Sequence, residues 1–114
     1  HKIYAEPTTI TGSIGVFGII PNMQGFFKNK LGITFDGEKT NTYADMMTTS
    51  RPLTADEKDM IQGYIDRFYD TFKQRVADGR GMSVEAVDAV GQGRVWTGTD
   101  AKARGLVDEL GGLE

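Results

Sequence analysis

The chain has 114 residues, of which 13 are basic and 16 acidic, giving a net charge of −3. This is the length of one ordinary domain, and the basic residues form no stripe that would attract nucleic acid or anionic lipid, so those partners are set aside. The absence of cysteine excludes disulfides, thiolate metal sites and cysteine nucleophiles. No apolar run approaches the roughly 18 residues of a membrane span, and the first residues differ from a signal peptide.

Short strands and one helix are predicted in the first third of the chain. The apolar run at residues 2–5 predicts a short buried strand, and residues 10–16 predict a second extended segment. Pro21 can open a helix that continues to residue 31, with Gly32 as its left-handed C-cap. Residues 33–37 predict another short strand. Because the pattern begins within a strand, we expect the chain to be a piece of a longer protein.

A long loop and a long helix follow. Residues 38–52 show no regular period, and loops of this length are usually functional or mobile. Thr54 and Glu57 have the spacing of a capping box, which begins a helix ending near Gly79. Its apolar residues repeat with helical spacing and are expected in the core or in an oligomer contact: Met60, Ile61, Tyr64, Ile65, Phe68, Phe72 and Val76.

The last third alternates helices with short strands. Ser83 can cap a helix that reaches residue 90, and residues 94–96 predict a strand containing Trp96, which we expect in the core. Thr97 and Asp100 are spaced to begin another helix, and residues 106–110 predict a last strand or turn. This alternation predicts an α/β layer architecture.

Three glycines, Gly12, Gly15 and Gly18, are spaced three apart in the apolar run ITGSIGVFGII. Glycine weakens a strand interior, so the spacing indicates a bulge, a bend or a close approach of another backbone. Tight packing and a ligand-facing role both explain it. A phosphate-binding loop is disfavoured, because the residue order of such motifs is missing.

The inventory of catalytic residues is small. The only histidine is His1, at the very terminus, and none of the serines, Ser13, Ser50 and Ser83, lies in a G-x-S-x-G turn. A serine–histidine triad or a histidine metal site would therefore depend on a terminal residue. We expect no metal and no cofactor.

Two segments carry a resemblance to a known family. The segment KIYAEPTTITGSIGVFGIIPN resembles the region after the nucleophile in the signal peptide peptidase A, or protease IV, family, and GRVWTGTDAKARGLVDELGGLE resembles its C-terminal pattern. The tail pattern is shared more loosely with the Clp protease and crotonase superfamily. The resemblance implies an α/β fold with a crotonase-like spiral core. Residues 1–114 would then be a single partial domain, the C-terminal part of a catalytic domain with short strands and about four helices.

The resemblance also implies a chemistry. Members of this family are serine peptidases with a serine–lysine dyad, which degrade cleaved signal peptides. A lysine desolvated in an apolar pocket loses its proton near neutral pH and can activate the serine when a neighbouring hydroxyl holds its amine in line. In the family this orienting role belongs to the TGS serine, which here is Ser13, the expected catalytic residue. Thr11, Gly12, Ile14 and Gly15 are the expected substrate-binding residues, where an extended peptide adds as a strand.

The sequence departs from the family at two points. The nucleophile lies in an A-S-G-G type motif further upstream than this sequence reaches, so we expect the chain alone to be inactive. The lysine base follows an aromatic residue in a G-x-Y-K pattern, but here Ala44 follows Tyr43. Lys39 is five residues early and is interpreted as a solvated loop lysine. The chain therefore resembles the second half of the long, duplicated form, in which another repeat supplies the lysine.

Partners and location follow from the same resemblance. We expect apolar signal peptides as substrates, a homo-oligomer, and a protein anchored in the bacterial envelope with its catalytic domain on the extracytoplasmic side. Membrane contact would be made only through segments outside this chain. The apolar residues Phe17, Ile19 and Ile20 are candidates for a substrate subsite, although burial in the core is favoured for them.

Two other functions remain open. Ala44 at the position of the base is also expected in a degenerate, non-catalytic repeat that acts as a scaffold or a peptide-binding module. A crotonase-like fold is also compatible with holding an acyl thioester, since fold alone does not fix function. The TGSIG run favours the peptidase, because it is typical of that family rather than of the superfamily.

Overall fold

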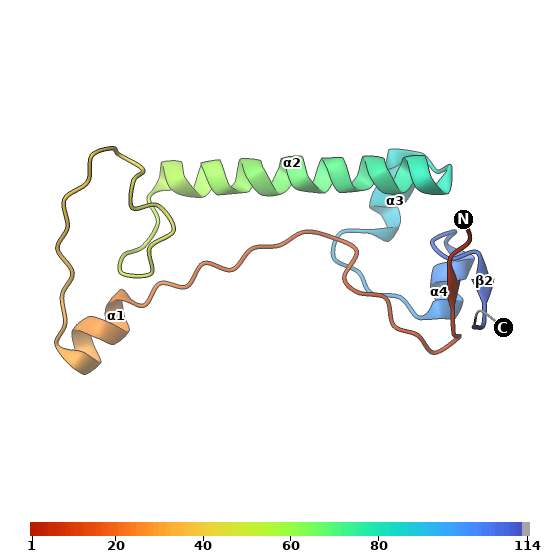
Figure 1. The fold of residues 1–114 in the computed structure, drawn as a ribbon, viewed down its shortest axis with the longest axis horizontal. Helices are drawn as coiled ribbons and strands as arrows, with labels where there is room; N and C mark the ends of the chain where they lie inside the picture. The colour runs from red at the N-terminus through yellow and green to blue at the C-terminus, as the bar shows by residue number, and fades with distance from the viewer. Residues whose placement is uncertain (113–114) are drawn as a thin grey trace. The chain divides into compact units, whose positions relative to one another are not determined.

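The computed structural model describes residues 1–112 (Figure 1), so Leu113 and Glu114, the end of the C-terminal pattern, lie outside the described residues. The elements in chain order are β1 (Tyr4–Ala5), α1 (Gln24–Phe26), the π-helix η1 (Phe27–Leu31), α2 (Ala55–Arg80), α3 (Val84–Val90), α4 (Gly98–Ala103) and β2 (Glu109–Leu110). The chain divides into two compact units. The first unit comprises residues 1–16 and the chain from residue 66 onward, and the second comprises residues 17–65.

Helix α2 begins and ends as the sequence predicts. The hydroxyl of Thr54 accepts a hydrogen bond from the amide of Glu57 (3.2 Å), and the Glu57 carboxylate accepts one from the amide of Thr54 (2.8 Å). At the other end Gly81 has a φ of 62°, and the amide of Met82 donates to the carbonyl of Ala77 (3.1 Å), which is the Schellman arrangement. The predicted capping box is therefore confirmed.

No helix among residues 1–112 is long and apolar enough to cross a membrane.

The apolar stripe of α2 is not uniformly buried. Tyr64 remains 49% exposed and Phe68 67% exposed. The prediction that these side chains lie in a core is wrong for the described part of the chain, because too little of it packs against this face to cover them. Their alternative role in an oligomer contact stays a prediction. The buried apolar residues all belong to the first unit: Ala77, Val87, Ala101 and Val107.

The sheet of the first unit is small. Strands β1 and β2 are parallel, with Tyr4 opposite Glu109 and Ala5 opposite Leu110. The strands predicted at residues 2–5 and 106–110 are thus shorter than expected. The predicted burial of the first strand is also wrong, since Ile3 and Tyr4 are 46% and 36% exposed. Strand β1 pairs with only one other strand in the described chain, which leaves its opposite edge uncovered.

The shorter helices of the first unit are capped by the predicted side chains. The hydroxyl of Ser83 accepts from the amide of Ala86 (3.1 Å) at the start of α3. The hydroxyl of Thr97 accepts from the amide of Asp100 (3.1 Å) at the start of α4. Both caps satisfy amides that have no partner within the helix, and both predictions are confirmed.

The second unit contains α1 and η1 and is otherwise irregular. The helix predicted from Pro21 begins only at Gln24, and Gly32 adopts the expected left-handed C-cap conformation with a φ of 66°. The strand predicted at residues 33–37 is wrong, because residues 17–65 form no strand that could pair with it. Instead, the ring of Phe35 packs edge-on against Phe27, with centroids 5.0 Å apart. Residues 38–52 form turns and bends, as expected of a loop.

One ion pair joins three segments of the chain in the first unit. Arg80, the last residue of α2, donates two hydrogen bonds to the carboxylate of Asp108 (2.9 and 2.7 Å) and one to the carbonyl of Gly105 (2.7 Å). The same carboxylate accepts from the amide of Ile3, just before β1 (2.7 Å). The Arg80 guanidinium and this amide hold the pKa of Asp108 well below its usual range. Asp108 therefore fastens α2, β1 and the chain before β2 together.

Replacing Asp108 with alanine should lower the melting temperature by several degrees, because Arg80 and the Ile3 amide both lose their acceptor. The matched control is Glu109→Ala, since Glu109 pairs with Lys2 at the exposed surface, where such pairs contribute little. Thermal unfolding followed by circular dichroism compares the two variants. Equal melting temperatures in both would show that the Asp108 pair has no special structural role.

Candidate functional site

The predicted site lies in the ribbon, which we define as residues 10–15. The amide of Thr11 donates to the carbonyl of Trp96 (2.9 Å), and the amide of Ile14 donates to the carbonyl of Arg94 (2.9 Å). These contacts form two isolated antiparallel bridges, Ile10 with Thr97 and Ile14 with Arg94. The strands predicted at residues 10–16 and 94–96 are therefore present only as bridges, although their pairing brings the ribbon beside the C-terminal third of the chain.

The ribbon has one residue more than the segment that it pairs with. Thr11 and Ile14 are three residues apart, whereas their partners Trp96 and Arg94 are only two apart. Such an extra residue makes a β-bulge, which bends the strand and turns a side chain away from the regular alternation. Here the bulge falls at Gly12 and Ser13. Bulges of this kind are frequent beside active sites.

The three glycines of the run serve different purposes. A Cβ added at Gly12 would meet nothing within 4 Å, but one at Gly15 would lie 2.7 Å from the nitrogen and 2.9 Å from the Cα of Gly93. At Gly18 the nearest atom, in the side chain of Ile65, would be an ordinary 3.7 Å away. Close approach of a second backbone thus explains Gly15. Gly12 faces open space, and no hydrogen bond within residues 1–112 reaches its backbone.

The hydroxyls of the ribbon are used differently. Ser13 is exposed, and its hydroxyl has no hydrogen-bond partner among the described residues, whereas its carbonyl accepts from the amide of Gly15 (3.0 Å). The hydroxyl of Thr11 accepts from the amide of Trp96 (2.9 Å) and so helps to hold the ribbon. The structure therefore brings Thr11, Gly12, Ser13, Ile14 and Gly15 together on one paired segment, with the Ser13 hydroxyl open to solvent.

Trp96 and the two remaining serines have structural contacts. The indole of Trp96 is half-buried, donates to the carbonyl of Val90 (2.8 Å) and carries the guanidinium of Arg104 over its ring, 3.5 Å from the centroid. Ser83 caps α3, and Ser50 shares a hydrogen bond with Thr48 (2.8 Å). These contacts account for all three side chains without a catalytic role.

The sequence does not predict that the turn at residues 91–93 contacts the ribbon. The amide of Gly93 donates to the carbonyl of Ile14 (2.8 Å), and the preceding residue, Gln92, has a positive φ of 59°. The amide of Gln92 donates to the hydroxyl of Tyr69 on α2 (2.9 Å). The only signal in the sequence was the pair Gly91 and Gly93, which marks a turn but not its partner.

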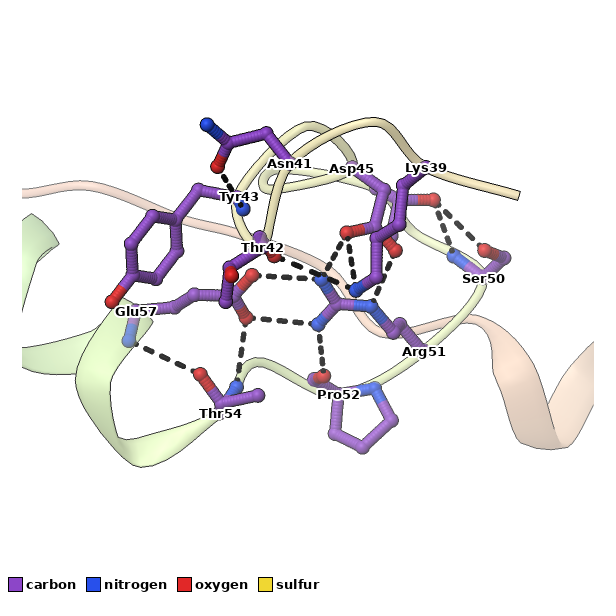
Figure 2. A network of polar contacts seen from close by, with 11 residues as sticks. Lys39, Asn41, Thr42, Tyr43, Asp45, Ser50, Arg51, Pro52, Thr54 and Glu57 are labelled. Carbon is purple, nitrogen blue, oxygen red and sulfur yellow. Dashed lines mark hydrogen bonds and ion pairs between the residues drawn. The ribbon is translucent and has the colours of Figure 1, made fainter. Parts of the chain in front are cut away.

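A second place of interest is the loop that contains Ala44. Figure 2 shows Arg51 between two carboxylates, donating to Asp45 (2.9 and 2.8 Å) and to Glu57 (2.8 and 2.7 Å). The amine of Lys39 also donates to Asp45 (3.0 Å). Lys39 is an exposed loop lysine, as predicted, and this ion pair occupies its amine. Ala44 is exposed, and its amide donates to the carbonyl of Asn41 (3.1 Å).

Burial makes this network important for the second unit. Glu57 is only 1% exposed, and a buried carboxylate needs a charged or hydrogen-bonding partner. Arg51 lowers the pKa of Glu57 from 4.5 to about 2, helped by the Thr54 amide, and it lowers the pKa of Asp45 well below its usual range. The network fixes residues 45–51 to the start of α2.

A pocket of about 370 Å³ opens beside the network, bordered by Gln24, Phe35, Lys39, Asp45, Ser50 and Arg51. None of the buried side-chain polar atoms in the described chain lacks a hydrogen-bond partner. Nor do three metal-binding side chains gather anywhere in residues 1–112. The pocket therefore has no buried polar group without a hydrogen-bond partner and no cluster of metal-binding side chains that would indicate a bound ligand.

Comparison with known proteins gives a consistent picture. The whole chain, residues 1–114, matches the family described as "Peptidase family S49". It is 42% identical over 114 residues to "Protease 4" of Salmonella typhi and 37% identical over 114 residues to "Serine protease SPPA, chloroplastic" of Arabidopsis thaliana. Those matches cover 100% and 99% of this chain but only 18% and 17% of the two relatives.

A third relative has a shorter chain. It is a protein of Enterococcus faecium whose name includes the words "signal peptide peptidase SppA", 38% identical over 110 residues. The match covers 96% of this chain and 32% of that protein. The chain thus spans less than a third of each of these three relatives.

Alanine at Gly15 should destabilise the protein, because its methyl group would overlap the backbone of Gly93. Overpacking of this kind costs about 1–3 kcal/mol of unfolding free energy. Gly12→Ala is the matched control, and we expect it to change stability by less than about 1 kcal/mol, since its Cβ points into open space. Urea unfolding measures both. A Gly15→Ala variant as stable as Gly12→Ala would contradict the close approach to Gly93.

The pKa of Glu57 predicts an acid-sensitive contribution to stability. Its folded-state pKa is about 2 and its ordinary value 4.5, so the contribution is full above about pH 4.5 and is lost as the pH falls toward 2. Glu57→Gln should lower the melting temperature at pH 7 and reduce its decline between pH 4.5 and 2. Calorimetry across this range tests the prediction, with Asp56→Asn, the exposed neighbour, as control. A wild-type acid profile in Glu57→Gln would refute it.

Proposed function

Because the chain belongs to peptidase family S49, we propose that the full-length protein is a serine endopeptidase that degrades cleaved signal peptides with a serine–lysine dyad. Residues 1–114 form the C-terminal part of its catalytic domain, which has a crotonase-like spiral core. The nucleophilic serine lies upstream of residue 1, and the lysine comes from another repeat or subunit. The observation that carries this proposal is the exposed hydroxyl of Ser13 on a bulged, paired ribbon.

The open side of the ribbon is suited to an extended peptide. One edge of the ribbon is paired with residues 94–97, while the backbone of Gly12 has no partner in the described chain. A peptide can add to such an edge as a further strand, with its alternate side chains directed into pockets. The lack of a side chain at Gly12 lets the two backbones approach. An apolar signal peptide is the substrate that we assign to this edge.

Ser13 acts on the lysine rather than on the substrate. A lysine works as a general base only when it is neutral and its lone pair points at the serine hydroxyl. A hydroxyl with no other hydrogen-bond partner can hold the amine in that direction, and the hydroxyl of Ser13 has none within residues 1–112. Lys39 is not assigned this role, because its amine is engaged by Asp45.

The location and the oligomeric state of the protein belong to the same proposal. We place it in the bacterial cell envelope, anchored by segments outside residues 1–114 and with its catalytic domain on the extracytoplasmic side. It works as a homo-oligomer, in which the exposed aromatic residues of α2, Tyr64 and Phe68, provide contact surface. Phe17 and Ile19, which are 76% and 80% exposed rather than buried as the sequence favoured, are candidates for an apolar substrate subsite.

Ala44 supports a second candidate function. A methyl group cannot accept a proton, so the position at which the family pattern has its lysine is inactive here. If no other segment supplied the base, the protein would bind peptides along the ribbon without cleaving them. The residues encoded before His1 distinguish the two functions. An A-S-G-G type serine there supports the peptidase, and its absence supports a peptide-binding scaffold.

Ser13→Ala in the full-length protein should lower kcat by about 100-fold or more, because the lysine loses its orientation, while KM changes little. A fluorogenic peptide with an apolar core serves as substrate. Thr8→Ala is the control, since Thr8 is an exposed neighbour whose hydroxyl makes no hydrogen bond in the described chain. A fluorophosphonate probe should label a serine upstream of residue 1. Unchanged kcat in Ser13→Ala, or label on Ser13 itself, would overturn the assignment.

A further inference from the structure

The hydroxyl of Tyr69 lies where α2, α3 and the turn at residues 91–93 meet. It donates a hydrogen bond to the carboxylate of Asp88 on α3 (2.9 Å) and accepts one from the amide of Gln92 (2.9 Å). Burial raises the pKa of the Tyr69 phenol above its usual value. A single hydroxyl therefore connects both helices to the turn.

The turn adopts a backbone conformation that needs such support. Gln92 has a φ of 59° and is one of two non-glycine residues with positive φ among the described residues. This left-handed backbone conformation is unfavourable for residues other than glycine. A residue stays in it only when contacts with its neighbours hold it there. The Gln92 amide is held by Tyr69, and its side-chain amide donates to Asp88 (3.0 Å). Two anchors thus oppose relaxation of this residue.

The carboxylate that orients Tyr69 is itself held in place. The Gln92 side-chain amide and the Tyr69 hydroxyl lower the pKa of Asp88, and the amine of Lys73 lies 3.5 Å from it. The same amine lies 4.5 Å from the centre of the Tyr69 ring. Asp88 therefore stays ionised and accepts from the phenol, which leaves the phenol oxygen free to accept from the backbone of the turn.

The turn is in direct contact with the ribbon. The amide of Gly93 donates to the carbonyl of Ile14 (2.8 Å), and the backbone of Gly93 packs against Gly15. A Cβ added at Gly91 would lie 2.8 Å from the Tyr69 hydroxyl, 3.1 Å from the Val87 carbonyl and 3.4 Å from the Ile14 carbonyl, so a side chain there would displace the hydroxyl. Ile14 and Gly15 follow Ser13 in the chain. A shift of the turn must therefore shift the bulge that presents the Ser13 hydroxyl.

We infer that Tyr69 is a positioning residue for Ser13: through Gln92 and Gly93 it fixes the bulge, and thereby the direction of the hydroxyl that steers the lysine. The inference rests on the role proposed for Ser13. It adds a residue that lies 56 positions away in the sequence and touches neither substrate nor lysine. Tyr69 controls turnover rather than peptide affinity.

A double-mutant cycle in the full-length protein tests the inference. Tyr69→Phe removes only the hydroxyl and should lower kcat about tenfold or more, with little change in KM, because a small misplacement of a catalytic group costs up to about 100-fold. In a Ser13→Ala background the same substitution should lower kcat further by less than about twofold, since the hydroxyl that it positions is already gone. The substrate is the fluorogenic apolar peptide, and Tyr4→Phe is the matched control, because the Tyr4 hydroxyl has no partner within residues 1–112.

Hydrogen exchange provides the structural readout. The amide of Gln92 loses its acceptor in Tyr69→Phe, so exchange of the peptide that covers residues 90–95 should accelerate, while exchange in α4 stays unchanged. Asp88→Asn is the second variant. It replaces one of the two carboxylate oxygens that accept hydrogen bonds from Tyr69 and Gln92, and it should lower kcat as Tyr69→Phe does. It therefore takes the place of Tyr69→Phe in the cycle if that variant does not fold.

The outcomes separate this inference from the proposed function. Wild-type kcat in Ser13→Ala would refute the role of Ser13, and with it the basis of the inference. A strong loss in Ser13→Ala, together with wild-type kcat in Tyr69→Phe, would refute the role of Tyr69 alone. Equal losses from Tyr69→Phe in both backgrounds would also refute it, since Tyr69 would then act independently of Ser13. Unchanged exchange at residues 90–95 would exclude the turn as the connection.

Discussion

The first unit depends on the antiparallel pairing of residues 10–14 with residues 94–97, which joins residues 80 or more positions apart in the chain. Close approach requires glycine at Gly15, where an added Cβ would overlap the backbone of Gly93, and just beyond the pairing at Gly98, where it would overlap the carbonyl of Glu6. The extra residue in the ribbon cannot be absorbed by the pairing and appears as a bulge. The exposure of the Ser13 hydroxyl is thus a geometric consequence of how the two segments match.

Polar contacts fasten the rest of the structure, because few apolar side chains are fully buried in the described residues. Arg80 and Asp108 tie the end of α2 to β1, and Arg51 with Glu57 ties the loop at residues 45–51 to the start of α2. Each guanidinium makes paired hydrogen bonds to a carboxylate, which fixes orientation as well as distance. Both ends of α2 are therefore defined by ion pairs in addition to their caps.

The proposed function gives these features a common purpose. In the proposed reaction the chain contributes a peptide-binding edge and an orienting hydroxyl, while the nucleophile and the base come from elsewhere in the protein. Such a division demands a stiff ribbon, because a hydroxyl that steers an incoming lysine is useful only in one direction. The turn at Gln92 has a positive φ and is held by Tyr69, which is itself hydrogen-bonded to Asp88, and these contacts stiffen the chain beside the ribbon.

The sequence by itself determined the features that depend on neighbouring residues. The caps at Thr54, Ser83 and Thr97 connect positions three residues apart, so their patterns identified α2, α3 and α4 correctly, and the TGSIG run pointed to the right family. Only the tertiary structure decided what depends on distant partners: the missing strand at residues 33–37, the exposure of Phe68, the backbone contact that makes Gly15 necessary, and the bond from Tyr69 to Gln92. A strand forms only when another strand pairs with it, and a side chain is buried only when other residues pack over it. In both cases the partner lies elsewhere in the chain, so the local sequence does not identify it.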